Sequence, residues 1–122
     1  MTDVVVTVPK AQWQSWIDEG DLPGEVAQYE SHFWLGWQGL PMTIAPGERV
    51  YIVAHGKLRG FAPLIRVERP CRLDSWKACL VRAGGAEAVT IPEAIRGFQG
   101  WRYRWWPRSA EVPFPDWMEV SA

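Results

Sequence analysis

The chain of 122 residues contains no asparagine and only two cysteines, Cys71 and Cys79. Without asparagine, its turns depend on glycine, proline, aspartate and serine. The cysteines form no C-x-x-C pair, and only His32 and His55 could join them as metal ligands, so we expect no metal and no cofactor. The spacing of the two thiols also permits a disulfide, but we expect both to be free in a reducing, cytoplasmic compartment.

Long apolar runs and local catalytic motifs are also missing. No stretch approaches the ~20 apolar residues of a membrane span, and no hydrophobic leader follows Asp3, so we expect neither a membrane nor an export role. The chain carries no G-x-S-x-G, H-E-x-x-H, P-loop or G-x-G-x-x-G motif. A site assembled from separate strands is still possible, but the absences favour a protein that binds rather than catalyses.

Cations are nearly absent from residues 1–48, where Lys10 stands against seven acidic residues. Residues 49–110 reverse the balance with twelve cations against four acids, and residues 111–122 add three acids and no cation. A basic middle between acidic ends fits an anion-binding face on one side of the molecule. It fits equally a fold in which the ends neutralise the middle, because sequence segments need not map to opposite faces.

The segment GFQGWRYRWWPR, residues 97–108, contains no acidic residue. If residues 101–106 form a strand, successive side chains point to opposite faces of a sheet. One face then carries the rings of Trp101, Tyr103 and Trp105. The other carries Arg102, Arg104 and Trp106.

This alternation predicts a surface on which rings stack on bases and arginines hold phosphates, with Trp106 as the most exposed ring. The alternative is that the rings fill the core and the arginines form a solvated face. The candidate binding residues of this segment are Trp101, Arg102, Arg104, Trp105, Trp106 and Arg108.

Two further groups are candidates for ligand binding. His55, Lys57 and Arg59 surround a glycine turn, where three groups that can carry positive charge suit an anion; an ordinary polar turn is the alternative. Trp34 and Trp37 could line a pocket, and packing in the core is the alternative for both.

The hydrophobic patterns predict six or seven short strands and one early helix. Residues 49–55 and 58–67 form the clearest hairpin, and the first of these strands is apolar on both faces, which predicts a position well inside a sheet. Pro63 in its partner predicts a free edge or a bulge nearby. The other predicted elements are strands at 4–8, 28–37, 79–82, 86–91 and 101–106, with 79–82 and 86–91 as a second hairpin, a helix at 9–19, and an extended surface tail at 110–122.

These elements predict one α+β domain over residues 1–122, mainly β, built as a small mixed β-barrel with the helix beside it. The stretch PGERVYIVAHGKLRGFAPLIRVE, residues 46–68, resembles the hairpin pattern of PUA-like barrels, notably their ASCH and EVE branches. The chain also resembles a group of bacterial and phage proteins with a GWRYRWW motif.

The PUA-like resemblance implies a pseudobarrel that binds RNA or a modified base in an aromatic pocket. Some ASCH relatives hydrolyse acylated cytidine with a Lys, a Thr and a Glu, from a motif of the type G-x-K-x-x-T-x-R. This chain departs from that motif, because none of its four threonines follows a lysine by three positions. We therefore expect a binding module rather than a hydrolase.

Three functions remain open from the sequence. The first is a non-catalytic module that recognises RNA, single-stranded DNA or a nucleobase-like small molecule through the arginine and tryptophan residues. The second is a nucleoside-processing hydrolase of ASCH type, with His55, Lys57 or a glutamate as acid–base group. The third is a phage or mobile-element accessory protein that acts by protein–protein contact, for example as a homodimer that buries Trp106 and Trp117.

Overall fold

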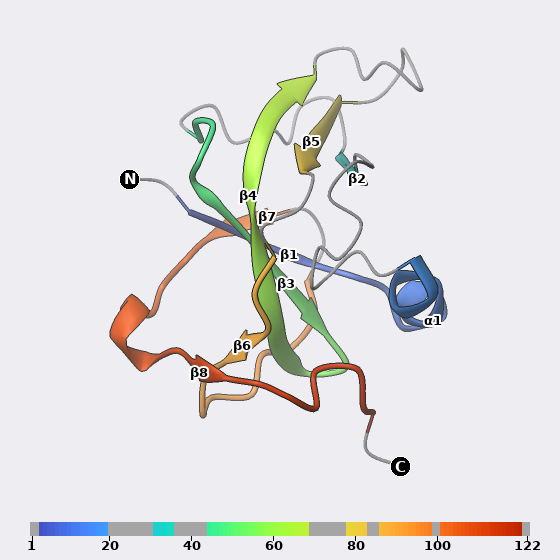
Figure 1. Ribbon diagram of the computed structural model, residues 1–122, viewed down its shortest axis with the longest axis vertical. Helices are drawn as coiled ribbons and strands as arrows, with labels where there is room; N and C mark the ends of the chain where they lie inside the picture. Colours follow the sequence, from blue (N-terminus) through green and yellow to red (C-terminus); the bar gives the residue numbers. More distant parts are fainter. Residues whose placement is uncertain are drawn as a thin grey trace.

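A single six-stranded mixed sheet forms the centre of the molecule (Figure 1). The computed structural model describes residues 3–19, 31–35, 44–68, 78–82, 86–98 and 101–120. The strand order is β2-β5-β4-β3-β1-β7, and β6 pairs with β8 in a separate two-stranded sheet. The elements are β1 (Val4–Thr7), α1 (Lys10–Glu19), β2 (Ser31–Leu35), β3 (Arg49–Ala54), β4 (Lys57–Glu68), β5 (Ala78–Arg82), β6 (Val89–Thr90), β7 (Trp101–Tyr103), a 3-10 turn (Arg108–Ala110) and β8 (Val112–Pro113).

Strand β3 lies inside the sheet, as its apolar pattern predicts. It pairs with β4 in antiparallel fashion and with β1 in parallel fashion. Val50 and Ile52 point to one face and Tyr51 and Val53 to the other, and all four are buried. The two faces of this part of the sheet therefore support two separate hydrophobic clusters.

The first cluster lies on the face covered by α1 and by the end of the chain. Helix α1 begins directly after Pro9, which suits the first turn of a helix, and Trp13 packs edge-on against Trp117 with 5.8 Å between the ring centroids. Its buried members are Val4, Val6, Val8, Trp13, Ile44, Val50, Ile52, Ala54, Leu64, Leu80 and Trp117.

The second cluster lies on the opposite face, under the segments around Ile91–Ile95 and Trp106. Its buried members are Val5, Tyr51, Val53, Leu58, Phe61, Ile91, Ile95 and Trp106. This cluster positions part of the candidate binding segment, because Phe98 packs against it and Trp106 belongs to it.

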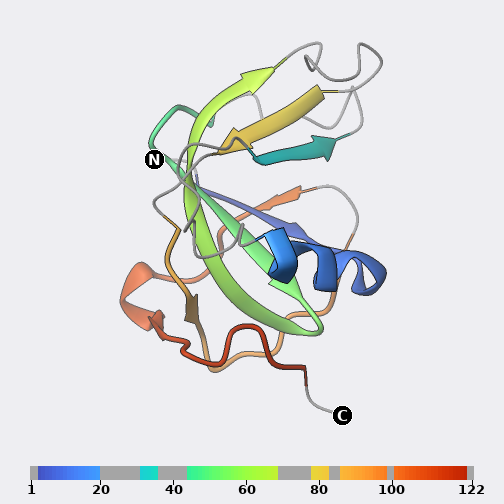
Figure 2. The same cartoon turned by 45° about the vertical axis from the view of Figure 1, so that its right-hand side comes forward.

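The sheet is open, so the prediction of a closed barrel is wrong for the described residues. Strands β2 and β7 are its two edges in the described part of the chain, where β2 pairs with β5 and β7 pairs with β1. Strand β4 is 12 residues long and curves strongly, which carries β5 and β2 around above the other strands (Figure 2). Register shifts between Ile52 and Val53 and between Leu64 and Arg66 interrupt its pairing on both sides of Pro63, and such bulges bend a strand.

The predicted second hairpin is also wrong. Strand β5 pairs with β2 and β4, whereas Val89 and Thr90 pair with Val112 and Pro113 near the end of the chain. The Gly84–Gly85 pair predicts a turn between neighbouring segments. The strand pairings that the fold adopts join segments that are distant in the sequence, so a turn motif could not predict them.

The predicted surface tail is only partly correct. Val112 and Pro113 are exposed, as expected, but Trp117 belongs to the first cluster. Arg59 fixes this segment, because its guanidinium donates hydrogen bonds to the carbonyl oxygens of Trp117 and Glu119 at 3.2 and 2.7 Å. The segment after β8 is therefore part of the core packing.

Candidate ligand-binding face

The strand predicted for residues 101–106 ends at Tyr103. Within β7 the expected alternation is present: Trp101 and Tyr103 pack edge-on with 4.6 Å between ring centroids. Arg102 contacts the ring of Phe98 instead, with its guanidinium carbon 4.4 Å from the ring centre. Because Phe98 packs against the second cluster, Arg102 lies over that cluster.

Beyond Tyr103 the alternation fails, and the prediction of Trp106 as the exposed ring is wrong. Trp106 is 5% exposed and belongs to the second cluster. Its indole N–H donates to Glu111 at 2.9 Å. Trp105 is exposed instead, at 43%, and packs edge-on against Trp106 with 4.9 Å between ring centroids. The pairing with β1 ends near Asp3, so the chain leaves the sheet and Trp106 turns inward.

Two of the predicted phosphate-binding arginines converge on one buried carboxylate. Arg104 Nε donates to Asp3 Oδ2 at 3.0 Å, and Arg108 donates to it through Nη2 at 2.9 Å and Nε at 3.2 Å. The backbone N–H of Arg49 donates to Asp3 Oδ1 at 2.9 Å. Burial alone would raise the pKa of Asp3, but the hydrogen bonds from Arg49, Arg108 and Arg104 outweigh it and lower the pKa below 3.8.

A second carboxylate, Glu111, joins the other side of this group. Arg49 Nη1 donates to Glu111 Oε1 at 3.0 Å, and the Tyr51 hydroxyl donates to Glu111 Oε2 at 2.5 Å. Burial and the Glu111 hydrogen bond raise the pKa of Tyr51 to about 12, so the phenol stays neutral. We call this group the polar cluster; its members are Asp3, Arg49, Tyr51, Arg104, Trp106, Arg108 and Glu111.

The polar cluster joins both acidic ends of the chain to its basic middle. Asp3 comes from the first segment, Glu111 from the last, and the arginines from the middle. Sequence reasoning did not single out Asp3, Arg49 or Glu111. Their only signal is the uneven charge distribution, which shows that the segments are complementary but not which residues meet.

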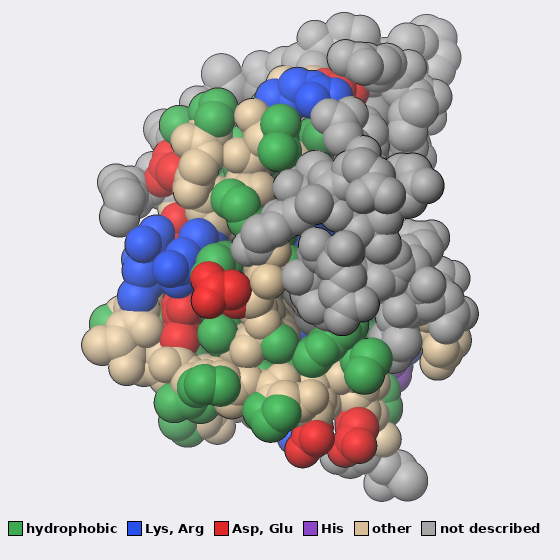
Figure 3. Space-filling view, viewed as in Figure 1, with side chains coloured by type: hydrophobic (Ala, Val, Ile, Leu, Met, Phe, Trp, Pro, Cys, Tyr) green, Lys and Arg blue, Asp and Glu red, His purple; other side chains and the backbone are tan. Residues whose placement is uncertain are grey.

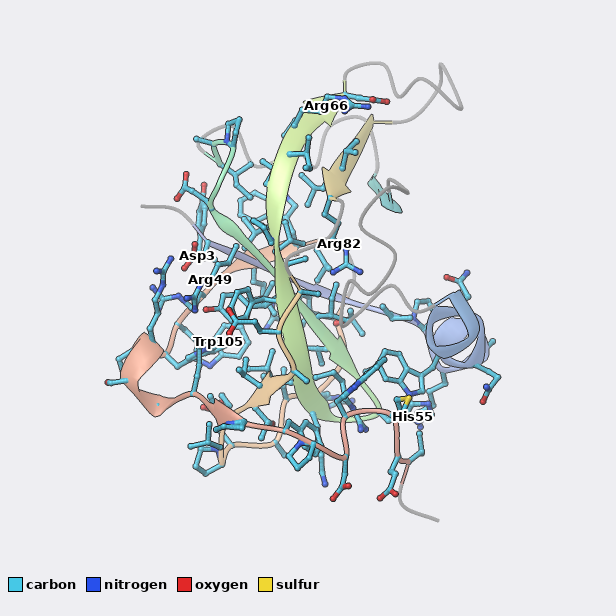
Figure 4. The ribbon with its side chains drawn as sticks, in the orientation of Figure 1. Asp3, Arg49, His55, Arg66, Arg82 and Trp105 are labelled. Carbon is cyan, nitrogen blue, oxygen red and sulfur yellow. The ribbon has the colours of Figure 1, made fainter. Side chains whose placement is uncertain are left out.

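The hairpin tip lies away from this face. Figure 4 shows His55 at the opposite end of β3 from Arg49 and Asp3. His55 and Gly56 have positive φ values of 49° and 75°, as in the two-residue turns that join antiparallel strands. Burial lowers the pKa of His55, and the charges of Arg59 and Lys10 lower it further, which is unfavourable for anion binding.

Arg59 is not available at the hairpin tip, contrary to the prediction. It is the extra residue of the β-bulge between β3 and β4 and is 1% exposed. Its Nε donates to the carbonyl oxygen of Ala54 at 2.9 Å, and its remaining hydrogen bonds hold the end of the chain. Lys57 is exposed at the turn.

Of the two tryptophan candidates outside this segment, the structure describes only the backbone of Trp34. Trp34 lies on β2, at the opposite edge of the sheet from β7. Its side chain and all of Trp37 lie outside the described residues, as does the Cys71 of the predicted thiol pair. Trp106 and Trp117 are buried within the chain, so neither ring is free for the homodimer contact considered above.

Replacing Tyr51 with phenylalanine tests the hydrogen bonds of the polar cluster. We expect the free energy of unfolding to fall by about 1–2 kcal/mol, because Glu111 loses a donor and Arg49 an acceptor in a buried place. Urea denaturation of Tyr51→Phe, Glu111→Gln and the double variant measures their coupling. Strictly additive effects would show that the short contact between the two side chains adds nothing to stability.

Among the described residues, no group of three or more His, Cys, Asp or Glu side chains could hold a metal ion. No helix in the described part of the chain is long and apolar enough to cross a membrane. Comparisons with protein-family models, with curated proteins and with solved structures gave no match.

Proposed function

We propose that this protein is a non-catalytic binding module for single-stranded nucleic acid. The observation that carries the proposal is the exposed ring of Trp105 on the same face of the sheet as Arg102, with both residues lying over the second cluster. An exposed ring on a face that also carries a guanidinium group suits a ligand that is flat and anionic at once. Nucleotides in a single strand offer both an unstacked base and a phosphate.

The charge of this face supports the same ligand. The polar cluster holds three arginines against the two carboxylates of Asp3 and Glu111, which leaves one positive charge. Arg102 adds an exposed cation on the same side of the sheet. Figure 3 shows basic side chains gathered on one flank of the molecule with acidic side chains beside them. Glu93, which accepts a hydrogen bond from the indole N–H of Trp105 at 3.3 Å, offsets one of these charges, so this set of residues keeps one net positive charge.

The PUA-like resemblance of residues 46–68 favours the same class of ligand, because PUA-like domains bind RNA or modified bases. We include in the proposal that this chain is a PUA-like domain with an open sheet. Strands β3 and β4 form the hairpin on which the resemblance rests, and Arg49 of the polar cluster is the first residue of β3.

Fluorescence anisotropy with a labelled oligothymidylate of about 12 nucleotides tests the proposal. We expect the logarithm of the binding constant to fall linearly with the logarithm of the salt concentration, because phosphate contacts release counterions. Arg102→Ala should reduce the slope by about 0.7, the value for one phosphate contact on a single strand. Trp105→Ala should weaken binding about tenfold with little change in slope, because stacking is worth ~1–3 kcal/mol per base.

Lys10→Ala is the matched control, since it removes one exposed positive charge from α1, away from the proposed face. It should alter affinity much less than Arg102→Ala. Absence of salt-sensitive binding by the wild-type protein rules out the proposal. Equal effects of Lys10→Ala and Arg102→Ala also contradict it, because they would show that affinity depends on the net charge of the protein and not on the proposed face.

A further inference from the structure

We infer that Arg49, Arg104 and Arg108 form a site for one phosphate group at the surface of the polar cluster. Assigning that phosphate to a nucleotide rests on the proposed function, whereas the anion site itself stands on the geometry of these arginines. No residue of the cluster other than these three carries a positive charge.

The buried carboxylate of Asp3 fixes two of the guanidinium groups. Arg108 bonds Asp3 through Nε and Nη2, and Arg104 does so through Nε. Arg104 Nη1 also donates to the carbonyl oxygen of Trp106. Holding the side chains in place before a ligand arrives lowers the entropy lost on binding.

The third arginine is fixed by other contacts. The guanidinium carbon of Arg49 lies 4.0 Å above the ring of Phe61, and Nη1 donates to Tyr51 and Glu111. Within the described residues, Arg49 Nη2, Arg104 Nη2 and Arg108 Nη1 make no hydrogen bond. The side chains of Arg49 and Arg108 are 25% and 35% exposed. Each arginine thus keeps donors that a ligand could use.

The charge of the cluster favours an anion with several oxygen atoms. Asp3 is bonded by two arginines, although a simple ion pair needs one. Planar guanidinium groups match the oxygen spacing of phosphate, which makes arginine the preferred residue for such ligands. In Figure 4, Asp3 and Arg49 lie on the flank where Figure 3 shows basic side chains at the surface.

The site is connected to the exposed ring of Trp105. Trp105 packs on Trp106, whose indole N–H donates to Glu111, and Glu111 accepts a hydrogen bond from Arg49. One buried ring and one carboxylate therefore separate the proposed stacking ring from the proposed phosphate site. A nucleotide that stacks on Trp105 would bring its phosphate toward these arginines.

Titration of the 15N-labelled protein with inorganic phosphate, followed by NMR, tests the anion site directly. We expect saturable shifts at the arginines, and a dissociation constant about tenfold higher in Arg108→Gln, because a charge-assisted hydrogen-bonded pair is lost. Arg108→Lys keeps the charge but not the planar fork, and should also bind more weakly than wild type. Lys10→Gln should bind like wild type. Circular dichroism confirms that each variant is folded.

An oligothymidylate with and without a 5′ phosphate then identifies the source of the ligand. Tighter binding of the phosphorylated strand assigns the site to a terminal phosphate, and equal binding that still depends on Arg108 assigns it to the backbone. If Arg108→Gln and Arg108→Lys bind phosphate and both strands as wild type does, the anion site is refuted. Salt-sensitive binding of oligothymidylate in that case would still support the proposed function. If phosphate binds and neither strand does, the proposed function fails and the anion site stands.

Discussion

Replacing Gly60 with alanine is expected to lower the free energy of unfolding by about 3 kcal/mol or more. Gly60 has a φ of 157°, and a Cβ atom built there would lie 2.4 Å from the carbonyl oxygen of Glu87 and 3.2 Å from the Cα of Ala88. These are backbone atoms, and they are held by the two hydrogen bonds between Phe61 and Glu87. The clash can be relieved only if β4 separates from the segment that leads into β6.

Gly47 and Gly56 provide matched controls for Gly60. Both have positive φ values, 90° and 75°, but an added Cβ would meet nothing within 4 Å. Alanine at either position should therefore cost only the backbone strain, about 1–2 kcal/mol. Urea denaturation of the three variants gives the comparison. A Gly60→Ala variant no less stable than the two controls would show that the close approach of Gly60 to Glu87 does not hold in solution.

Replacing Asp3 with alanine is expected to lower the free energy of unfolding by about 3 kcal/mol, because removing one partner of a buried ion pair leaves uncompensated charge. The substitution removes the carboxylate that accepts from Arg104, Arg108 and the backbone N–H of Arg49. Both arginines are partly exposed, so water can solvate them and limit the loss. Asp116→Ala, at an exposed position, should change stability by less than about 0.5 kcal/mol.

The pH dependence of stability gives an independent test of Asp3. Its pKa in the folded protein is lowered from 3.8, so its stabilising effect is complete above pH 3.8. It is lost as the pH falls from that value through the lower pKa of the folded state. Asp3→Asn should lack this loss, and the difference in stability between the two proteins should shrink below pH 3.8. A difference that stays constant on acidification would contradict the lowered pKa.

Local patterns in the sequence were sufficient to predict β1, α1 and the hairpin of β3 and β4. Strand β3 is apolar at every position from Val50 to Ala54, which only a strand covered on both faces can accommodate. The single mixed sheet and its open edges depend on which strands pair. Those pairings join β1 with β3 and β7, and β8 with β6. They are distant in sequence, and no local pattern specifies them.

The candidate face was predicted in part. Arg102 and Trp105 are exposed in the segment where arginine and aromatic residues alternate. The prediction fails at Trp106, because alternation holds only while a strand is paired, and the partner of β7 begins at Val4. It fails at Arg59 because a β-bulge turns that side chain inward. Neither the end of a pairing nor the place of a bulge is encoded in composition or spacing.

The charge pattern left two interpretations open, an anion-binding face on one side or neutralisation between the segments, and the structure shows ion pairs between the segments at Asp3 and Glu111. Asp3 pairs with Arg104 and Arg108, and Glu111 pairs with Arg49. Arg102 lies outside these ion pairs and contacts the ring of Phe98. The proposed binding face therefore includes Arg102, which the acidic segments do not neutralise, and the exposed ring of Trp105, which packs on the buried Trp106.

The indole N–H signals of the nine tryptophans offer the most direct test of this face. An NMR titration of the 15N-labelled protein with oligothymidylate should shift the indole signal of Trp105 most, because its exposed ring would stack on a base. The backbone amides of Arg102 and Arg108 should shift with it, and the indole signal of Trp13, buried on the other side of the sheet, should stay in place. Shifts confined to the hairpin tip at His55–Lys57, or no saturable shift at all, would contradict the account.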